Sequence, residues 1–284
     1  MIDPFELPAL PLKDWISEFV AWLNVHLGTL FAASSLIIET IDGGLRTLLR
    51  LAPPPLVIGA LFTLVVLRGR LGAAFAVLFS LLLVWNLNAW PQAIDTVSIL
   101  VIATTPAILI GLPIGILMSE TAVGRKTLTP LLDYMQTTPA FVYLIPSVLF
   151  FGIGTTPGVF ATFVFCLPPF ARAVALGLDE VPRECIEAGI SVGLTPWKLI
   201  LKVKLPLAAP FLVAGINQCV MLSLSMVVIA SLIGARGLGT QVIESLTQMD
   251  FALGIEAGIC VVALALTIER TLQSFTTGRW LWKQ

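Results

Sequence analysis

Two long stretches without a charged side chain constrain this sequence more than any other feature. Residues 134–171 and residues 205–235 contain no Asp, Glu, Lys or Arg. A helix of about 20 apolar residues crosses the ~30 Å hydrocarbon core of a bilayer, and both stretches exceed that length. Hydrophobic residues make up 57% of the 284 residues and charged residues only 12%, about half the charged fraction of an average soluble domain. We therefore expect an all-α integral membrane protein rather than a soluble enzyme.

Hydropathy predicts about seven transmembrane helices after Pro53-Pro54-Pro55. Their expected ranges are 55–67, 71–90, 94–118, 137–154, 157–178, 208–233 and 251–269. We divide the chain into an N-terminal segment, two peripheral spans, a core with a cytoplasmic loop at 179–206, and a cytoplasmic tail. These parts cover residues 1–50, 51–90, 91–275 and 276–284.

The N-terminal segment has a different pattern from the spans. Residues 15–41 place apolar side chains every three to four positions but also contain Glu18, Asn24, His26 and Glu39. This spacing favours an amphipathic helix on the membrane surface, with a spanning helix as the alternative. His26 is then a surface or interfacial side chain. The first residues lack a basic segment followed by an apolar one, so we predict no cleavable signal peptide.

The loops sort by charge into two faces. One face holds Arg68 and Arg70, Arg125 and Lys126, the stretch 183–204 and the tail 270–283, whereas the other has only Arg236. Because Lys and Arg accumulate on the cytoplasmic side, we expect the N-terminus outside and the C-terminus inside. Trp280 and Trp282 are then candidate interface anchors. Arg46 and Arg50 lie on the outer side and count against this orientation.

The sequence argues against several functional classes. A formal net charge of −1 excludes a nucleic-acid binder driven by charge. The four cysteines, at 166, 185, 219 and 260, form no CxxC pair and accompany a single histidine, so we expect buried apolar thiols rather than a metal site. No GxxxxGK[ST] loop and no catalytic triad or metalloprotease motif occurs. We expect no enzymatic activity and no bound cofactor in this chain.

Prolines and glycines mark the predicted spans. Pro106 and Pro113, Pro139 and Pro146, and Pro168 and Pro169 suit either broken helices along a transport pathway or ordinary kinks. Gly111 and Gly115 form a GxxxG motif that would let a neighbouring helix approach closely.

The longest predicted cytoplasmic loop carries a helical pattern. Residues 179–206 read DEVPRECIEAGISVGLTPWKLILKVKLP. Apolar residues recur at helical spacing between Pro182 and Leu194, and Thr195-Pro196 begins a second short helix. Two short helices across the cytoplasmic face make a docking surface.

This loop resembles the cytoplasmic signature of permease subunits of binding-protein-dependent ABC importers. The matching residues are Glu187-Ala188-Gly189, Gly193, Val203 and Leu205-Pro206, with Gly for the second Ala and Val for the usual Ile. The resemblance implies a type I ABC importer permease fold in which Glu187 to Gly193 is the coupling helix of the ATPase. It further implies that Gly189 and Gly193 allow close approach and that Glu187 supplies polar contact.

Three longer segments narrow the resemblance. Residues 132–158, 167–182 and 217–239 are similar to permeases of the glycine betaine, proline and choline importers, and the similarity extends from about residue 45 to 270. Arg236 departs from the small residue expected before Gly237-Leu238-Gly239. The resemblance implies import of glycine betaine, choline, carnitine or proline betaine across a bacterial inner membrane. The implied partners are a second permease copy, two cytoplasmic ATPases that bind ATP and Mg, and an extracytoplasmic binding protein.

Polar residues within the apolar spans are candidate pathway residues. They are Asn217, Gln218, Ser223, Ser225, Thr137 and Thr138. For each one we favour the alternative of a hydrogen bond between helices. Glu256, one turn into the last span, is a functional candidate by its depth, although a position in water at the outer interface is favoured for it and for Asp95.

Two other classes remain open from the residues alone. A secondary transporter driven by an ion gradient would need charges near the bilayer midplane and inverted repeats. We expect the central spans to lack such charges, and we detect no repeat. A membrane scaffold would need neither kinked helices nor a docking loop.

Overall fold

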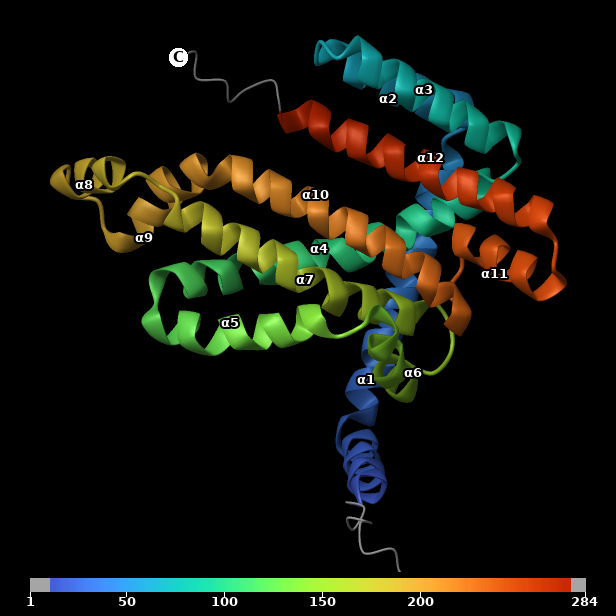
Figure 1. The fold of residues 1–284 in the computed structure, drawn as a ribbon, viewed down its shortest axis with the longest axis horizontal. Helices are drawn as coiled ribbons and strands as arrows, with labels where there is room; N and C mark the ends of the chain where they lie inside the picture. The colour runs from blue at the N-terminus through green and yellow to red at the C-terminus, as the bar shows by residue number, and fades with distance from the viewer. Residues whose placement is uncertain (1–10, 277–284) are drawn as a thin grey trace, which may run out of the picture.

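The computed structural model describes residues 11–276 and confirms the all-α fold (Figure 1). The described part contains no strand. Its helices are α1 Leu12–Leu51, α2 Pro54–Leu67, α3 Leu71–Asn86, α4 Trp90–Glu120, α5 Ala122–Thr137, η1 Ala140–Tyr143, α6 Leu144–Phe151, α7 Thr155–Asp179, α8 Arg183–Ser191, α9 Pro196–Leu199, η2 Ile200–Lys204, α10 Leu205–Ala230, η3 Ser231–Ile233, α11 Leu238–Gln248 and α12 Phe251–Thr276. The predicted anchors Trp280 and Trp282 lie outside the described residues.

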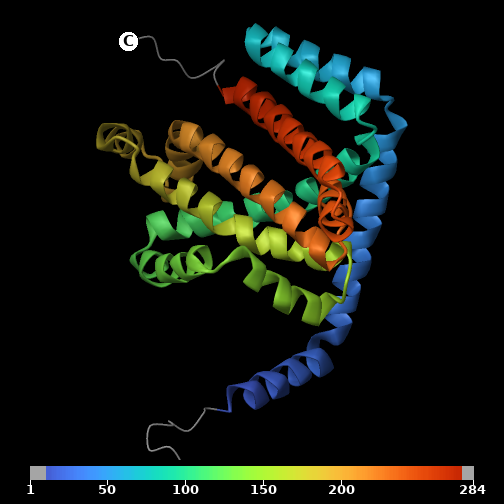
Figure 2. The same cartoon turned by 45° about the vertical axis from the view of Figure 1, so that its right-hand side comes forward.

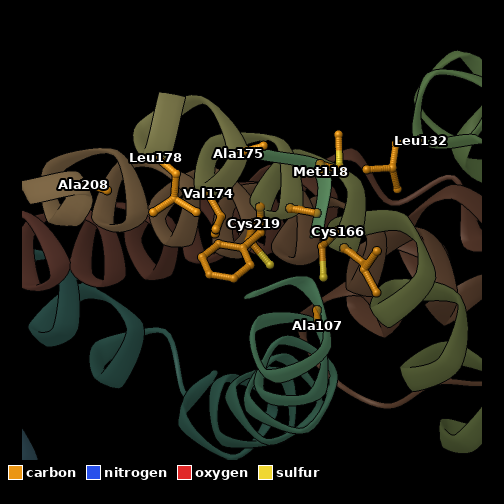
Figure 3. Packing of buried hydrophobic residues seen from close by; sticks show 12 residues of the cluster. Ala107, Met118, Leu132, Cys166, Val174, Ala175, Leu178, Ala208 and Cys219 are labelled. Carbon is orange, nitrogen blue, oxygen red and sulfur yellow. The ribbon is translucent and has the colours of Figure 1, made fainter. Parts of the chain in front are cut away.

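Helices α4, α7 and α10 form the centre of the bundle. Residues of all three meet in one buried cluster that includes Cys166 and Cys219 (Figure 3). The GxxxG motif on α4 faces α7, as predicted. A Cβ on Gly115 would lie 2.5 Å from the Ala171 carbonyl oxygen, so only glycine permits this approach. Close packing through small residues is the usual source of helix association in a bilayer, where lipid is as apolar as the helices.

The cysteines are buried or half-buried free thiols, and most of the prolines singled out in the sequence lie within continuous helices. Three of the four cysteines are buried and Cys185 is half-buried, all as free thiols. Helix α4 continues through Pro106 and Pro113, and α7 continues through Pro168 and Pro169. Of the six prolines singled out in the sequence, only Pro139 therefore coincides with an interruption of helix, between α5 and η1.

A second layer packs on one side of this centre. Helices α2 and α3 form a hairpin, and α3 lies against α12 (Figure 1). The Arg68 guanidinium sits 4.4 Å from the centre of the Phe275 ring, so the turn of the hairpin meets the end of α12. Both groups lie at the same end of the bundle as α8 (Figure 1).

Helix α1 runs crosswise to the bundle, at the end opposite α8 (Figure 2). It contacts the beginning of α4 and the end of α6, where Phe31 stacks on Phe150 at 4.8 Å between ring centroids. His26 is exposed, as predicted, and stacks on Trp22. This crosswise course agrees with the amphipathic pattern, although α1 is also long and apolar enough to cross a membrane.

Ion pairs fix the C-terminal half of α1 to α4. Asp42 is buried, accepts a hydrogen bond from the Ser98 hydroxyl at 2.7 Å and pairs with Arg46. Arg50 pairs with Asp95 at 2.9 Å. The expectation that Asp95 lies in water is therefore wrong, because its side chain is only 13% exposed. Because the positive-inside rule counts Lys and Arg rather than net charge, both arginines still count against the predicted orientation.

The fourth predicted span, residues 137–154, is corrected by the structure. Apart from Thr137, which ends α5, only Ala140–Phe151 is helical there, and 12 helical residues extend about 18 Å, too short to cross a bilayer. The amphipathic α5 runs back along α4 and α7 and precedes this short apolar piece, so two helical segments replace the single span. Their interruption lies at Thr138 and Pro139.

The connection 234–250 also differs from the expected loop, because it contains α11. Gly237 has φ 135°, and a Cβ there would lie 2.5 Å from Thr96 Oγ1, which accepts a hydrogen bond from the Leu238 amide at 2.8 Å. Arg236 points into open space as an exposed residue, so the departure at this position is accommodated without burying a charge.

Five helices of the described part are long and apolar enough to cross a membrane. They are Lys13–Leu51, Trp90–Glu120, Thr155–Asp179, Pro196–Ile233 and Phe251–Phe275. Helices α2 and α3 are apolar but shorter. Each predicted span thus has a helical counterpart, and the number of crossings stays a prediction.

Candidate functional site

The predicted coupling loop forms two short helices at one end of the bundle (Figure 1). Helix α8 carries Glu187, Ala188 and Gly189, and α9 with η2 leads back into α10. Gly189 is buried, and a Cβ there would lie 2.6 Å from Leu199 Cδ1. The close approach that this glycine allows is therefore made within the chain, between α8 and α9.

Gly193 has a structural role within this chain, and the close approach to the ATPase that the resemblance implies stays a prediction. A Cβ at this position would meet nothing within 4 Å, but its φ is +79°. The Gly193 amide donates to Ile190 O at 2.9 Å and the Leu194 amide donates to Gly189 O at 3.1 Å. This pair of bonds is the Schellman motif, which ends a helix with a left-handed residue. Gly193 thus ends α8 and directs the chain into α9, and within this chain it makes no close contact.

The outer surface of the coupling loop is apolar with one carboxylate. Glu187 and Ala188 are exposed, and so are large apolar side chains of the loop. These are Ile190 (58%), Val192 (77%), Trp197 (60%) and Leu201 (47%). Apolar side chains in water at the end of a membrane protein indicate a surface that another protein covers.

Both ends of the coupling loop are tied to the turn between α4 and α5. Asp179 at the end of α7 accepts bonds from Arg125 Nη2 at 2.8 and 2.9 Å and from Ser119 Oγ at 2.7 Å. Lys204 Nζ donates to Glu120 Oε1 at 2.6 Å. Lys204 ends the π-helical turn η2, which precedes the signature residues Leu205 and Pro206 at the start of α10. These contacts therefore join the coupling loop to α4 and α5 as well as to α7 and α10.

We expect Lys204→Met to weaken this link. The substitution leaves Glu120 without its partner, and both uptake and ATP hydrolysis stimulated by a loaded binding protein should fall about threefold to tenfold together. Lys202→Met, two residues earlier on an exposed position, is the matched control and should change neither rate. Equal rates for the Lys204 variant and the control would contradict a mechanical role for the ion pair.

The candidate pathway residues of α10 separate into two groups. Gln218 and Ser225 lie on an exposed stripe of the helix, whereas Ser223 is buried and its hydroxyl donates to Cys219 O at 2.8 Å. Asn217 is half-buried, and its Oδ1 is a buried atom with no hydrogen-bond partner. The stripe that can face a pathway therefore includes Gln218 and Ser225, and Ser223 bonds within its own helix.

The remaining candidates lie elsewhere. The hydroxyls of Thr137 and Thr138 both donate to Tyr134 O, at 3.0 and 2.9 Å, where α5 ends. Glu256 is exposed near the start of α12. The structure gives no contact between these residues and the α10 stripe, so it does not gather the seven candidates into one cluster.

Sequence reasoning missed one ion pair inside the bundle. Arg172 of α7 pairs with Asp133 of α5. Arg172 lies seven residues before Asp179, about two helical turns from the end of α7 and within the predicted span 157–178. The expectation that the central spans lack charges near the bilayer midplane stays a prediction. Asp133 and Arg172 are the two charged residues that bound the charge-free segment 134–171. The sequence signal for this pair was the position of its two residues at the two ends of the charge-free segment. The fold brings those two ends together.

No metal centre is indicated in the part of the chain that the structure describes. Residues 11–276 contain no group of three or more His, Cys, Asp or Glu side chains able to hold an ion. The ion pairs between described residues lie at the two ends of the bundle, except for Asp133–Arg172, which lies about two turns from the end that carries α8.

The sequence matches one family model and close relatives over most of its length. Residues 107–273 match the family "Binding-protein-dependent transport system inner membrane component". The chain is 40% identical over 275 residues to the glycine betaine/proline betaine transport system permease protein ProW of Escherichia coli (strain K12), covering 96% of this chain and 77% of that protein. It is also 40% identical over 273 residues to the glycine betaine/carnitine transport permease protein GbuB of Listeria monocytogenes, covering 95% and 96%.

Solved structures share the fold. The inward-facing MetNI methionine ABC transporter has a chain that matches with a TM-score of 0.61 at 22% identity, covering 64% of this chain and 91% of that chain. A second crystal form of the same transporter gives the same TM-score with 66% and 94% covered. At this identity the likeness concerns the arrangement of helices alone.

Proposed function

Because this chain belongs to the family of inner-membrane components of binding-protein-dependent transport systems, we propose that it forms the pathway of an importer for a quaternary ammonium compatible solute. The family places it as the permease subunit of an ABC importer. The solute class rests on the printed names of two relatives, which transport glycine betaine with proline betaine or carnitine. These compounds share a quaternary ammonium group and a carboxylate.

The partners follow from what the chain contains and what it exposes. It has no phosphate-binding loop, so the ATP and Mg would be bound by a separate cytoplasmic ATPase, in two copies for two permeases. The apolar surface of α8 and α9, with Glu187 at its edge, is the proposed docking surface for that ATPase. An extracytoplasmic binding protein would deliver the solute to the opposite end.

The proposed orientation places α8 and α9 in the cytoplasm. The α2–α3 turn with Arg68 and Arg70, the start of α5 with Arg125, and the basic coupling loop lie at that end of the bundle, which supports this orientation under the positive-inside rule (Figure 1). The N-terminus would then be outside and the C-terminus inside. Helix α1 would lie on the outer membrane surface, with exposed Trp15 and Trp22 at the level of the lipid headgroups.

Coupling in this proposal is a movement of packed helices. Closure of the ATPases around ATP would shift α8, which contacts α9 and η2. The ion pairs of Asp179 and Lys204 would carry the shift to the α4–α5 turn, and the tight packing of α7 on α4 and α10 would turn the helices as a unit. Packed interfaces have discrete arrangements, which suits alternation between two pathway openings.

The test is uptake of labelled glycine betaine in cells that depend on this transporter. Uptake should survive collapse of the ion gradient and stop when ATP is depleted. Excess unlabelled carnitine, proline betaine and choline would rank the substrates by competition. Uptake that follows the ion gradient and persists without ATP would overturn the proposal.

A further inference from the structure

We infer that Asp133 and Arg172 form a binding station for a zwitterionic solute inside the pathway, an inference that rests on the proposed function. Arg172 Nη2 donates to Asp133 Oδ1, and the two side chains are 34% and 53% exposed in the single chain. All other ion pairs between described residues lie at the two ends of the bundle. This pair is the one that a solute would meet between those ends.

The cost of charge in lipid indicates what covers the pair. Arg172 lies in α7 about two turns from the cytoplasmic end and further from the other end, at the depth of the membrane. Ionisable groups at such depth face protein or water rather than lipid. The open face around the pair is therefore covered by the second permease copy or by a water-filled pathway between the copies.

Other exposed polar groups continue this face. Gln136 and Thr137 follow Asp133 by three and four positions and are exposed, so they lie one turn further along the same side of α5. On α10, a Cβ at Gly215 would lie 2.5 Å from the Cβ of Ala173, which follows Arg172 on α7, so Gly215 lies at the level of Arg172. Gln218 is exposed and lies three residues, about one turn, after Gly215. A polar route through apolar spans thus passes the ion pair.

A merely structural role explains the pair poorly. Helices α5 and α7 are already joined two turns away by the bidentate pair of Arg125 with Asp179. The Nε of Arg172 is a buried atom without a hydrogen-bond partner, so a solute that reaches the pair would contact the terminal nitrogens of the guanidinium. Of these, only Nη2 has a hydrogen bond in the described part of the chain, and terminal guanidinium nitrogens can donate to a carboxylate.

The charges of a betaine match those of the pair. Its carboxylate would bind the Arg172 guanidinium, and its quaternary ammonium group, which has no hydrogen to donate, would lie against the Asp133 carboxylate. On binding, Arg172 and Asp133 would each exchange the opposite charge of the other for an opposite charge of the betaine. The net gain in free energy is small, so we expect weak binding and fast release. A cation without a carboxylate, such as choline, would find no partner for the guanidinium and would be held less well.

The first test uses the whole transporter in proteoliposomes, with its ATPase and its binding protein. Asp133→Asn with Arg172→Gln removes both charges and leaves no charge unpaired. We expect the number of glycine betaine molecules imported per ATP hydrolysed to fall at least about tenfold, because the coupling loop is intact and the pathway is not. Arg125→Gln with Asp179→Asn removes the other pair between the same helices and is the control. It should lower uptake and stimulated ATP hydrolysis together and leave their ratio unchanged.

A second measurement detects the solute at the station directly. Thr137→Cys, in a chain with Cys185→Ser, is labelled with a membrane-impermeant thiosulfonate reagent, and the three buried thiols serve as the unreactive background. Excess glycine betaine should slow labelling about threefold or more relative to sucrose of equal osmolarity, choline should not, and Arg172→Gln should abolish the protection.

The outcomes separate this inference from the proposed function. Wild-type uptake that is ATP-driven, together with an unchanged ratio in the uncharged double variant, would overturn the station and leave the importer standing. The station would also be overturned if the Thr137→Cys variant is not labelled, if glycine betaine does not slow its labelling, or if choline slows it equally. Failure of the wild type to import any betaine would overturn the proposed function itself.

Discussion

Replacing Gly193 with valine is expected to abolish ATP-driven uptake while the permease remains at its normal level in the membrane. Gly193 has φ +79°, and an L-residue in the left-handed region costs about 1–2 kcal/mol, more when the side chain is β-branched. The Schellman bonds of Gly193 and Leu194 would open, and the end of α8 would no longer be fixed against α9. We expect uptake to fall at least about twentyfold, measured against membrane level by immunoblot.

Gly193→Asn is the matched variant for this prediction. Asparagine adopts the left-handed conformation more readily than other residues, and an added Cβ meets nothing within 4 Å. It should retain most of the uptake. If asparagine inactivates the transporter as completely as valine, the glycine is required for contact with the ATPase rather than for the turn. If valine is tolerated, the assignment of α8 as the coupling helix fails.

The coupling loop shows how far the sequence alone could lead. The signature spacing predicted α8 and its place at one end of the bundle, because the loop is local and its helical pattern is short. The role of Gly193 could not be read from spacing, since glycine in a motif serves equally for close contact or for a positive φ. The backbone geometry shows the positive φ, and the empty space around the residue shows that no contact within this chain requires glycine there.

The apolar spans were predictable where one helix crosses the bundle without interruption. Helices α4, α7 and α12 each contain a predicted span, and α10 with η3 contains another, because apolar length is a property of the sequence itself. The fourth span was misplaced because α5 is amphipathic and apolar composition follows only its continuation in η1 and α6. Helix α11 was missed for the same reason, since an amphipathic helix has low mean hydropathy.

Pairs of distant charges were the least predictable feature. Asp133 pairs with Arg172, and Asp95 with Arg50, across separations of 39 and 45 residues. Each residue alone resembles an ordinary charge at the end of an apolar stretch. Partner and depth depend on how helices pack, and packing of α5 on α7 or of α1 on α4 is a tertiary property that no local pattern encodes.

Substituting Gly115 with valine should destabilise the permease more than any other single glycine substitution considered for α4 or α12. A Cβ on Gly115 would lie 2.5 Å from both the Ala171 carbonyl oxygen and the Val174 Cβ. A backbone oxygen cannot turn away, so α4 and α7 must separate. Overpacking of this kind costs about 1–3 kcal/mol or more. The thermal unfolding temperature of the purified permease in detergent should fall by several degrees.

Two other glycines, one on the same face of α4 and one on α12, make this prediction specific. A Cβ on Gly111 would meet the Phe170 ring at 2.8 Å, and a ring can rotate, so Gly111→Val should cost less. Gly258 of α12 has nothing within 4 Å, so Gly258→Val carries the same change in helix propensity without a clash. The expected order of destabilisation is Gly115, Gly111, Gly258. Equal unfolding temperatures for the Gly115 and Gly258 variants would show that α4 and α7 do not pack as closely as described, and that the bundle could not transmit movement from the coupling loop as one unit.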